Sequence, residues 1–378
     1  MPSVPAPFEQ PIYVVRPLLP SLALYTEALK GIWERQWLTN KGPLHDELER
    51  ALCAHLRVPH LSLTANGTTA LSLTFRALEL SGEIVTTPFT SPATPNAASW
   101  CGLEPVFADI DPITWTLDPN AVERAITPRT SAILGVHIYG MPCDLNALHT
   151  IAKQHNLKLI YDGAHAFGSE FNGEPISNFG DAMTLSFHAT KFYNTAEGGG
   201  VATLDPELKK RIDLLRTLGI QDETTVVLPG INGRMNELQA ALGLANLELV
   251  EEEYRSRSCI AEIYRSQLVG IDGLSLFELP SHVRNSHNYF VVRIDKSSRV
   301  SRDQLNDRLK GFNLFTRRYF YPLCSEFSFY RHMYSSRPEN LRVAHGASRQ
   351  VLCLPFYGKL GITNAQRICD IIKYVMET

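Results

Sequence analysis

A single lysine lies in a stretch of small, aromatic and hydroxyl residues. The stretch reads SFHATKFYNTAEGGG (186–200), begins like a β-strand and ends in three glycines, with Lys191 near its middle. An amine in an apolar pocket beside a phosphate can have its pKa lowered and act as a Schiff-base nucleophile. Ser186 could donate a hydrogen bond to that phosphate. The alternative is an ordinary surface lysine on a hairpin turn.

In a second segment, LIYDGAHAFG, an apolar strand ends at the carboxylate of Asp162, and His165 follows three residues later. A desolvated carboxylate is costly unless it has a partner. One suitable partner is the protonated ring nitrogen of a cofactor. The alternative is an aspartate that caps the next turn, which is the commoner outcome for a lone aspartate at a strand end.

The third candidate is LTANGTTAL (63–71), in which a strand runs through Asn66, Gly67 and Thr68 directly into a helix. Free N–H groups at a helix N-terminus, with the helix dipole behind them, form an anion site. Gly67 would let the backbone approach the anion closely. The alternative is a helix cap and a tight turn. The segment is neither a Walker A loop nor the glycine fingerprint of a nicotinamide dehydrogenase.

Together the three segments supply a phosphate cradle, an acid for a pyridinium nitrogen and an amine for an aldehyde. These are the groups by which pyridoxal 5′-phosphate (PLP) is bound in proteins. A metal site is not indicated, because His137, His165 and His188 lack the spacing of a metal-binding motif. A serine hydrolase is not indicated either, because G-x-S-x-G is absent.

The elements that must position these residues alternate from Val58 to about Thr203. The pattern predicts a mainly parallel sheet covered by helices on both faces. Ligands of such sheets bind beyond the carboxyl ends of the strands, where the candidate segments fall. Strands are predicted at 60–65, 83–87, 104–110, 131–139 and 157–162, and helices at 67–80, 96–102, 118–126 and 144–156.

After Gly230 the pattern changes. Residues 235–257 read as one long helix, with Leu238, Ala241, Leu242, Ala245 and Leu249 on a single apolar stripe. Strand-like and helical pieces then alternate to the end of the chain. A length of 378 residues suits two domains. We therefore predict a large α/β domain, 1–250, that binds PLP and a smaller C-terminal α+β domain, 251–378.

The composition is that of a soluble globular protein, with 44% hydrophobic and 20% charged residues and a formal net charge of −3. This balance gives no footprint for nucleic acid or a membrane surface. The first residues do not read as a signal peptide, and no apolar run is long enough to span a bilayer. The seven cysteines are scattered and never form a C-x-x-C pair, which favours reduced thiols without structural zinc. We expect a cytoplasmic protein without a metal.

An ordered set of motifs runs the length of the chain. The motifs are WLTNKGPLHDELE, ANGTTAL, TTPFTSPATPNA, PVFADIDP, VHIYGMPCD, YDGAHAFG, SFHATKFYNTAEGGG, INGRMNELQAALG and FTRRYFYPL. The set resembles the DegT-type sugar-nucleotide aminotransferases, which are PLP enzymes of the aspartate aminotransferase fold class. The PIYVVRP, INGRMNELQAA and FTRRYFYPL versions are most similar to the branch that makes 4-amino-4,6-dideoxyglucose on a dTDP carrier.

The resemblance implies an activity. An amino group would move from L-glutamate to dTDP-4-keto-6-deoxy-D-glucose, with pyridoxamine phosphate between the two half-reactions. The product would enter deoxysugar biosynthesis, such as that of lipopolysaccharide O-antigen. Amination at C3 of a keto-sugar nucleotide and a non-catalytic sugar-nucleotide sensor stay open as alternatives. A sugar 3-dehydratase of the same family is disfavoured, because those enzymes have histidine where this chain has Lys191.

The resemblance also implies roles for matching residues. Lys191 would hold PLP as a Schiff base, Asp162 would pair with the pyridine nitrogen, and His165 would lie near the phenolic oxygen. Asn232 would reach the phosphate of a partner subunit, so that the active site would form only in a homodimer. The residues that would bind the phosphate within one chain are Gly67, Thr68 and Ser186.

Two further segments carry polar and basic residues that could receive the sugar or its pyrophosphate, since arginine forks suit phosphate geometry. The alternative for each is surface solubility and packing. The residues are Thr39, Asn40, Lys41, Arg317, Arg318 and Tyr321. One position departs from the family, which usually has an aromatic residue over the cofactor ring where this chain has Ser91. Either Phe89 or another ring substitutes, or the stacking is absent.

Overall fold

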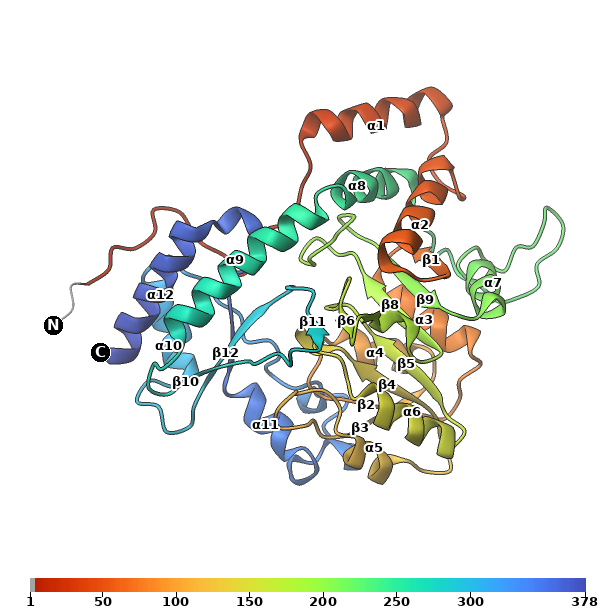
Figure 1. The fold of residues 1–378 in the computed structure, drawn as a ribbon. Helices are drawn as coiled ribbons and strands as arrows, with labels where there is room; N and C mark the ends of the chain where they lie inside the picture. Colours follow the sequence, from red (N-terminus) through yellow and green to blue (C-terminus); the bar gives the residue numbers. More distant parts are fainter. Residues whose placement is uncertain (1–3) are drawn as a thin grey trace.

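The computed structural model describes residues 4–378 and is built around a seven-stranded sheet of order β1-β9-β8-β5-β4-β2-β3. The strands from β8 to β3 are parallel, whereas β9 is antiparallel to both of its neighbours (Figure 1). The predicted mainly parallel sheet is confirmed. Its strands are β1 (His60–Thr64), β2 (Glu83–Thr86), β3 (Glu104–Phe107), β4 (Thr130–Val136), β5 (Lys158–Asp162), β8 (Ala182–Ser186) and β9 (Gly199–Thr203).

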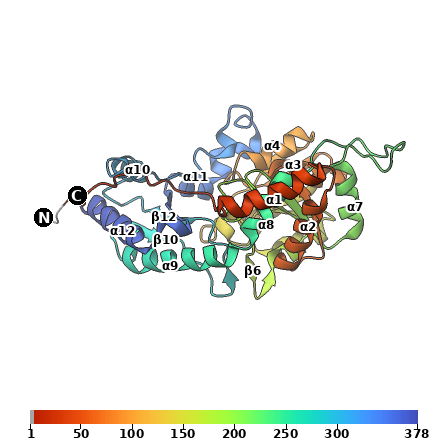
Figure 2. The same ribbon diagram turned by 90° about the horizontal axis from the view of Figure 1, so that it is seen from above.

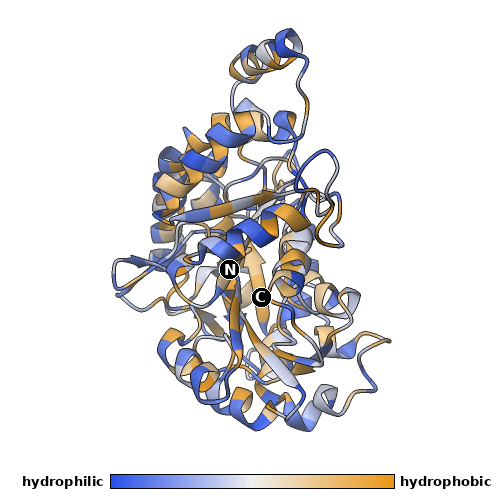
Figure 3. Cartoon of the chain, turned by 90° about the vertical axis from the view of Figure 1, so that its right-hand side faces the viewer, coloured by the Kyte–Doolittle hydropathy of each residue, from blue (hydrophilic) through white to orange (hydrophobic). Residues whose placement is uncertain are grey.

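Helices cover both faces of this sheet. Alternate residues of β5 point to opposite faces, so that Leu159 and Tyr161 join one core and Ile160 joins another. Figure 3 shows hydrophobic colouring along these central strands. The first face carries α2 (Pro43–Leu56), α5 (Pro119–Ala125) and α6 (Leu145–Gln154), and the second carries α3 (Gly67–Ala77), α4 (Ala93–Trp100) and α7 (Pro206–Leu215).

The long helix predicted after Gly230 is two helices. These are α8 (Glu237–Leu247) and α9 (Val250–Leu268), which meet at a bend at Glu248 and Leu249. The bend has a packing reason, because α8 belongs to the core of the large sheet while most of α9 faces a different core. The prediction of one helix was therefore wrong at its centre. Of the predicted apolar stripe, Ala241, Leu242 and Ala245 are buried, whereas Leu238 and Leu249 are half-buried.

The C-terminal part has its own core around a three-stranded sheet of order β10-β12-β13. The side chains of Phe8 and Ile12, from the start of the chain, pack in the same core. A separate small sheet of β6 (Glu170–Phe171), β7 (Glu174–Pro175) and β11 (Val283–Arg284) lies between the two parts. The division at residue 250 stays a prediction. The C-terminal elements are β10 (Leu274–Leu276), β12 (Phe290–Ile294), α10 (Arg302–Lys310), α11 (Arg342–Ser348), β13 (Val351–Leu354) and α12 (Ile362–Glu377).

The first helix, α1 (Leu22–Arg35), lies across α8 at the edge of the molecule (Figure 2). It buries Ile32 and leaves Leu22 and Trp33 exposed. Among residues 4–378, no helix combines the length and the apolar character that crossing a bilayer would need.

Candidate active site

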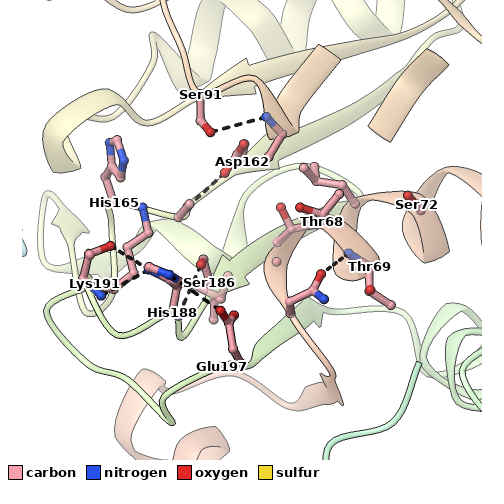
Figure 4. A pocket seen from close by; sticks show the side chains of 18 of the residues that line it. Thr68, Thr69, Ser72, Ser91, Asp162, His165, Ser186, His188, Lys191 and Glu197 are labelled. Carbon is pink, nitrogen blue, oxygen red and sulfur yellow. Dashed lines mark hydrogen bonds and ion pairs between the residues drawn. The ribbon is translucent and has the colours of Figure 1, made fainter. Parts of the chain in front are cut away.

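A pocket of about 640 Å³ lies at the carboxyl ends of the parallel strands. The ends of β5 and β8, the start of α3 and the turn before α4 form its walls, as sheets of this kind favour. Figure 4 shows Lys191, His165 and Asp162 close together on one side of the pocket and Thr68 and Thr69 on the other. The three segments singled out from the sequence therefore meet in one place.

Lys191 lies in the connection between β8 and β9, and its side chain lines the pocket. Burial lowers the pKa of Lys191 to about 8, and the carboxylate of Asp162 opposes that shift. Glu197, the acidic residue nearest in sequence, is exposed, and its Oε1 lies 3.6 Å from Nε2 of His188. Glu197 thus has a partner other than the amine, and Lys191 can lose its proton more easily than a surface lysine.

The four residues after Lys191 form a rigid support for it. Phe192 packs against Phe167, and Tyr193 stacks on the same ring at 4.6 Å. The N–H of Phe192 donates to Oδ1 of Asn288 over 2.7 Å. Asn288 lies just before β12, so this hydrogen bond connects the lysine segment to the C-terminal part. Asn194 is buried and donates from its side chain to the carbonyl of Leu18. Residues 192–195 (FYNT) are therefore buried packing residues that hold the segment of Lys191 in place.

Asp162 is buried, and each of its carboxylate oxygens accepts one hydrogen bond. The hydroxyl of Thr94 donates to Oδ2 over 2.8 Å, and the N–H of Ala164 donates to Oδ1 over 3.0 Å. Burial raises the pKa of Asp162, whereas these two hydrogen bonds and Lys191 act in the opposite direction. A protonated ring nitrogen in the pocket would supply the further positive charge that a buried carboxylate requires.

His165 is held as a neutral ring. Its Nδ1 accepts the N–H of Tyr139 over 3.3 Å, so Nε2 carries the hydrogen. Burial keeps the pKa of His165 well below its ordinary value, and the positive charge of Lys191 lowers it further. The ring therefore offers one N–H donor, which suits a phenolic oxygen.

The phosphate cradle is the N-terminus of α3. The side chain of Asn66 caps the helix by accepting the N–H of Thr69 over 2.8 Å, which leaves the first two N–H groups of the helix for an anion. A Cβ at Gly67 would lie 2.9 Å from Cβ of Ser186, and one at Gly199 would lie 2.6 Å from the carbonyl carbon of Asn66. The two glycines let β8, β9 and this helix start pack tightly around the cradle.

Ser91, at the position where the family usually has an aromatic residue, lines the pocket and offers no ring to stack on the cofactor. The hydroxyl of Ser91 accepts the N–H of Ala93 over 3.3 Å. Phe89 is fully buried and packs edge-on against Trp115, Tyr139 and Phe320, so it does not take the place of the missing ring. Other aromatic side chains do line the pocket, namely Trp100, Tyr289, Tyr319 and Phe320.

The remaining predicted residues fall outside this pocket. Asn232 is exposed, and so are Thr39, Asn40 and Lys41. The side chain of Arg234 joins two of them, because it donates to Asn232 and to Asn40. The two segments therefore form one exposed surface. Arg317, Arg318 and Tyr321 line a neighbouring groove instead.

Several residues at or behind the pocket were not predicted from the sequence. Thr94, which does not line the pocket but supports Asp162 from behind, has no role in the sequence analysis, because 68 residues separate the two. Tyr289 and Tyr319 come from the C-terminal part, and no spacing in the sequence relates them to Lys191.

These residues fit PLP. The glycine-lined helix start would hold its phosphate, and Asp162 has carboxylate capacity left for a ring N–H. The amine of Lys191 and the ring of His165 line the same pocket. Together with the fold, this set of groups defines a PLP-dependent transferase of the aspartate aminotransferase fold class.

The chain belongs to the DegT/DnrJ/EryC1/StrS aminotransferase family, whose pattern matches residues 23–373. It is 40% identical over 371 residues to the dTDP-4-amino-4,6-dideoxy-D-glucose transaminase of Escherichia coli, covering 97% of this chain and 99% of that one. The structure of DesI with its TDP-sugar product superposes with a TM-score of 0.93 at 38% identity, covering 98% of this chain and 94% of DesI. S. venezuelae DesV, solved with a ketimine intermediate, gives a TM-score of 0.88 at 30% identity over 96% of this chain and 99% of DesV. The family resemblance and the PLP dependence are confirmed.

Proposed function

We propose that this aminotransferase moves the amino group of L-glutamate to C4 of dTDP-4-keto-6-deoxy-D-glucose, giving dTDP-4-amino-4,6-dideoxy-D-glucose. The observation that carries the chemistry is the amine of Lys191, with a pKa lowered to about 8, in one pocket with the buried carboxylate of Asp162. The similarity to the Escherichia coli transaminase and to DesI over nearly the whole chain supports the substrate.

Each residue has a defined task in this proposal. PLP, when bound, supplies an electron sink for the carbon that carries the amino group. Asp162 would accept a hydrogen bond from the ring nitrogen and keep it protonated. Nζ of Lys191 takes a proton from the donor's α-carbon and, in the second half-reaction, gives one to C4 of the sugar. His165, whose Nδ1 accepts the N–H of Tyr139, would donate from Nε2 to the phenolic oxygen.

The phosphate would be held by main-chain N–H groups of Gly67 and Thr68 and by the hydroxyl of Ser186. These groups are neutral, so the dipole of α3 contributes to the attraction. Because these groups belong to the backbone and to a short side chain, they would fix the phosphate end of the cofactor relative to Asp162 and Lys191.

We further propose a homodimer in which Asn232 and the segment Thr39–Lys41 of one subunit complete the site of the other. The segment that precedes Asn232 exposes large apolar side chains, and so do α1 and the residues after it. Such exposed apolar surface is typical of an interface. The side chains are Leu22, Trp33, Trp37, Leu38, Leu218, Ile220, Val226, Val227 and Ile231.

The proposal is tested by incubating the PLP-loaded enzyme with glutamate and a panel of 3-keto and 4-keto sugar nucleotides. We expect 2-oxoglutarate and an aminated product from dTDP-4-keto-6-deoxy-D-glucose, and no product with Lys191→Ala. Preferential amination of a 3-keto sugar would contradict the assignment to C4. Full turnover by Lys191→Ala would contradict the role of the lysine.

A further inference from the structure

The segment 285–289 (NSHNY) joins β11 to β12 and reaches the active site from the C-terminal part of the chain. Four of its five side chains are buried. The hydroxyl of Ser286 donates to the carbonyl of His165. Oδ1 of Asn288 accepts the N–H of Phe192, the residue that follows the lysine. One segment of the C-terminal part therefore holds the main chain at both the histidine and the lysine of the pocket.

The middle of this segment has an uncommon backbone conformation. His287 has a φ of 52°, in the left-handed region that residues with a side chain rarely adopt. Its N–H donates to Oδ1 of Asn285 over 2.7 Å, and its carbonyl accepts Nη1 of Arg257 over 3.0 Å. Such conformations persist where the surrounding structure fixes them, and they concentrate at functional sites. Contacts on both sides of His287 fix this one.

Arg257, on α9, is fully buried. Its Nε donates to Oε1 of Glu253 over 2.6 Å, and its Nη1 lies 3.5 Å from the carbonyl of Asn288 in addition to that of His287. Burying an ion pair costs desolvation free energy, and apolar residues of similar volume often stabilise a fold as well. We therefore expect this buried arginine to serve a purpose other than stability.

Arg257 reaches the residue after the lysine by two routes. Its guanidinium carbon lies 5.0 Å from the centroid of the Phe192 ring, which is a cation–π contact. It also holds the carbonyl of Asn288, whose side chain accepts the N–H of Phe192 over 2.7 Å. In the described chain the pocket of Lys191 is lined by other residues, so these contacts act on the lysine segment from outside the pocket.

We propose that Arg257 and Asn288 are positioning residues that hold the main chain beside Lys191 and so keep its amine buried and in reach of the cofactor. The charge of Arg257 is paired with that of Glu253, so the arginine acts on the amine through main-chain position. The inference rests on the proposed role of Lys191, and it is independent of the sugar that the enzyme aminates.

Two variants release the lysine segment by different routes. Asn288→Ala leaves the N–H of Phe192 without its acceptor. Arg257→Met is combined with Glu253→Gln, so that no buried carboxylate loses its partner. The glutamine oxygen can still accept the N–H of Gly358, as Oε1 of Glu253 does over 2.9 Å. Glu253→Gln alone keeps the bonds from Arg257 to the two carbonyls and is the first control.

Arg302 on α10 offers a matched control. It is buried, pairs with Asp303 at 2.8 Å and donates from Nη1 to the carbonyls of Ser348 and Val351 over 2.8 and 3.2 Å. It thus has the same kinds of partner as Arg257, namely one carboxylate and two main-chain carbonyls. All of these partners belong to the C-terminal part, so Arg302→Met should cost stability without moving the lysine.

The first experiment measures the rate of PLP attachment to the apoprotein against pH, by absorbance after rapid mixing. The wild-type midpoint is expected at about 8, the pKa of Lys191. Asn288→Ala and the double variant should each move the midpoint upward by about one pH unit, because a loosened segment admits water to the amine. Arg302→Met and Glu253→Gln should keep the wild-type midpoint even where their melting temperatures fall. Wild-type midpoints in both segment variants would overturn the proposal.

The second experiment needs no PLP. Hydrogen exchange of the apoprotein, measured by mass spectrometry on the peptide that contains Phe192, reports whether this N–H stays protected. Exchange should be about tenfold faster in Asn288→Ala, as for one lost hydrogen bond, and unchanged in Arg302→Met. Arg257→Lys keeps a cation beside Glu253 but lacks a fork for two carbonyls, so an intermediate rate is expected. Equal exchange in the wild type, Asn288→Ala and Arg257→Lys would show that other contacts hold the segment.

These outcomes differ from those that test the proposed function. Wild-type attachment absorbance in Lys191→Ala would refute the role of the lysine and this inference with it. An enzyme that attaches PLP at Lys191 but aminates no keto-sugar nucleotide would refute the proposed activity and leave the positioning result standing. Once attachment at Lys191 is established, unchanged midpoints and exchange rates refute the positioning role alone.

Discussion

The hydroxyl of Thr94 donates to Oδ2 of Asp162 over 2.8 Å, and it accepts in turn from the hydroxyl of Thr90 at the same distance. The relay runs from the turn before α4 to the end of β5. It holds a buried carboxylate in one orientation and favours its ionised form, because hydrogen bonds to a carboxylate lower its pKa. The strength of PLP binding therefore depends in part on a residue that needs no direct contact with PLP.

Replacing Thr94 by valine keeps the shape of the side chain and removes the donor. The pKa of Asp162 should rise further, and the affinity for PLP should fall by about tenfold, as expected for a lost hydrogen bond to a charged group. Titration of the apoprotein with PLP measures the change. Thr94→Ser restores the hydroxyl and should recover the affinity. Unaltered PLP binding by Thr94→Val would show that the relay has no role.

The pKa of Lys191 predicts how the cofactor attaches. Only the neutral amine reacts, so the attachment rate should rise about tenfold per pH unit below pH 8 and level off above it. Asp162 raises the pKa of this amine, so Asp162→Asn should move the midpoint to lower pH. Stopped-flow absorbance after mixing apoprotein with PLP gives the profile.

Glu197→Gln is the matched control for that profile, because its carboxylate pairs with His188. We expect the midpoint of this variant to stay where the wild type has it. A midpoint near 10.5, the ordinary value for lysine, would show that the amine is solvated like a surface lysine and would contradict the burial argument.

The sequence was sufficient for much of the fold because strand and helix periodicities are local. The helices predicted at 118–126 and 144–156 are found as α5 and α6. Asp118 and Asp144 cap them, and a short polar side chain before a helical pattern is a local signal. The bend between α8 and α9 was missed, because it depends on which core each helix faces. That information lies in distant residues and not in the helix itself.

The candidate site divides in the same way. Lys191, Asp162 and Gly67 were found because each follows or precedes a strand of the parallel sheet, whose geometry places strand ends together. Tyr319 and Asn288 were not found, because their contacts with the lysine segment span about a hundred residues or more of sequence. The ion pair between Arg318 and Asp303 of α10 was not predictable either, because no motif relates the two residues.

The close packing at Gly67 predicts a steric effect. An added methyl group would lie 2.9 Å from Cβ of Ser186, too near for the helix start and β8 to stay in place. Gly67→Ala should weaken PLP binding by more than about tenfold and lower the free energy of unfolding by about 1–3 kcal/mol. Denaturant titration and PLP titration measure the two effects.

Gly346→Ala is the control for that substitution. A Cβ there meets no atom within 4 Å, and the residue lies in α11, where alanine is the better helix former. This variant should be as stable as the wild type or more so. Equal PLP affinity for Gly67→Ala and the wild type would mean that the helix start can move without loss of the cradle.

The proposed homodimer predicts complementation between two damaged chains. Lys191→Ala removes the amine from its own site, and Asn232→Trp blocks the surface that would complete the partner's site. In a mixed dimer one site carries both defects, and the other has an intact lysine and an intact asparagine. Random reassociation of equal amounts should therefore restore about a quarter of the wild-type activity, because half of the dimers are mixed and each has one working site. Activity assays before and after reassociation, with sedimentation to verify the dimer, test this. If the mixture gains nothing while mixed dimers form, Asn232 acts within its own subunit or not at all.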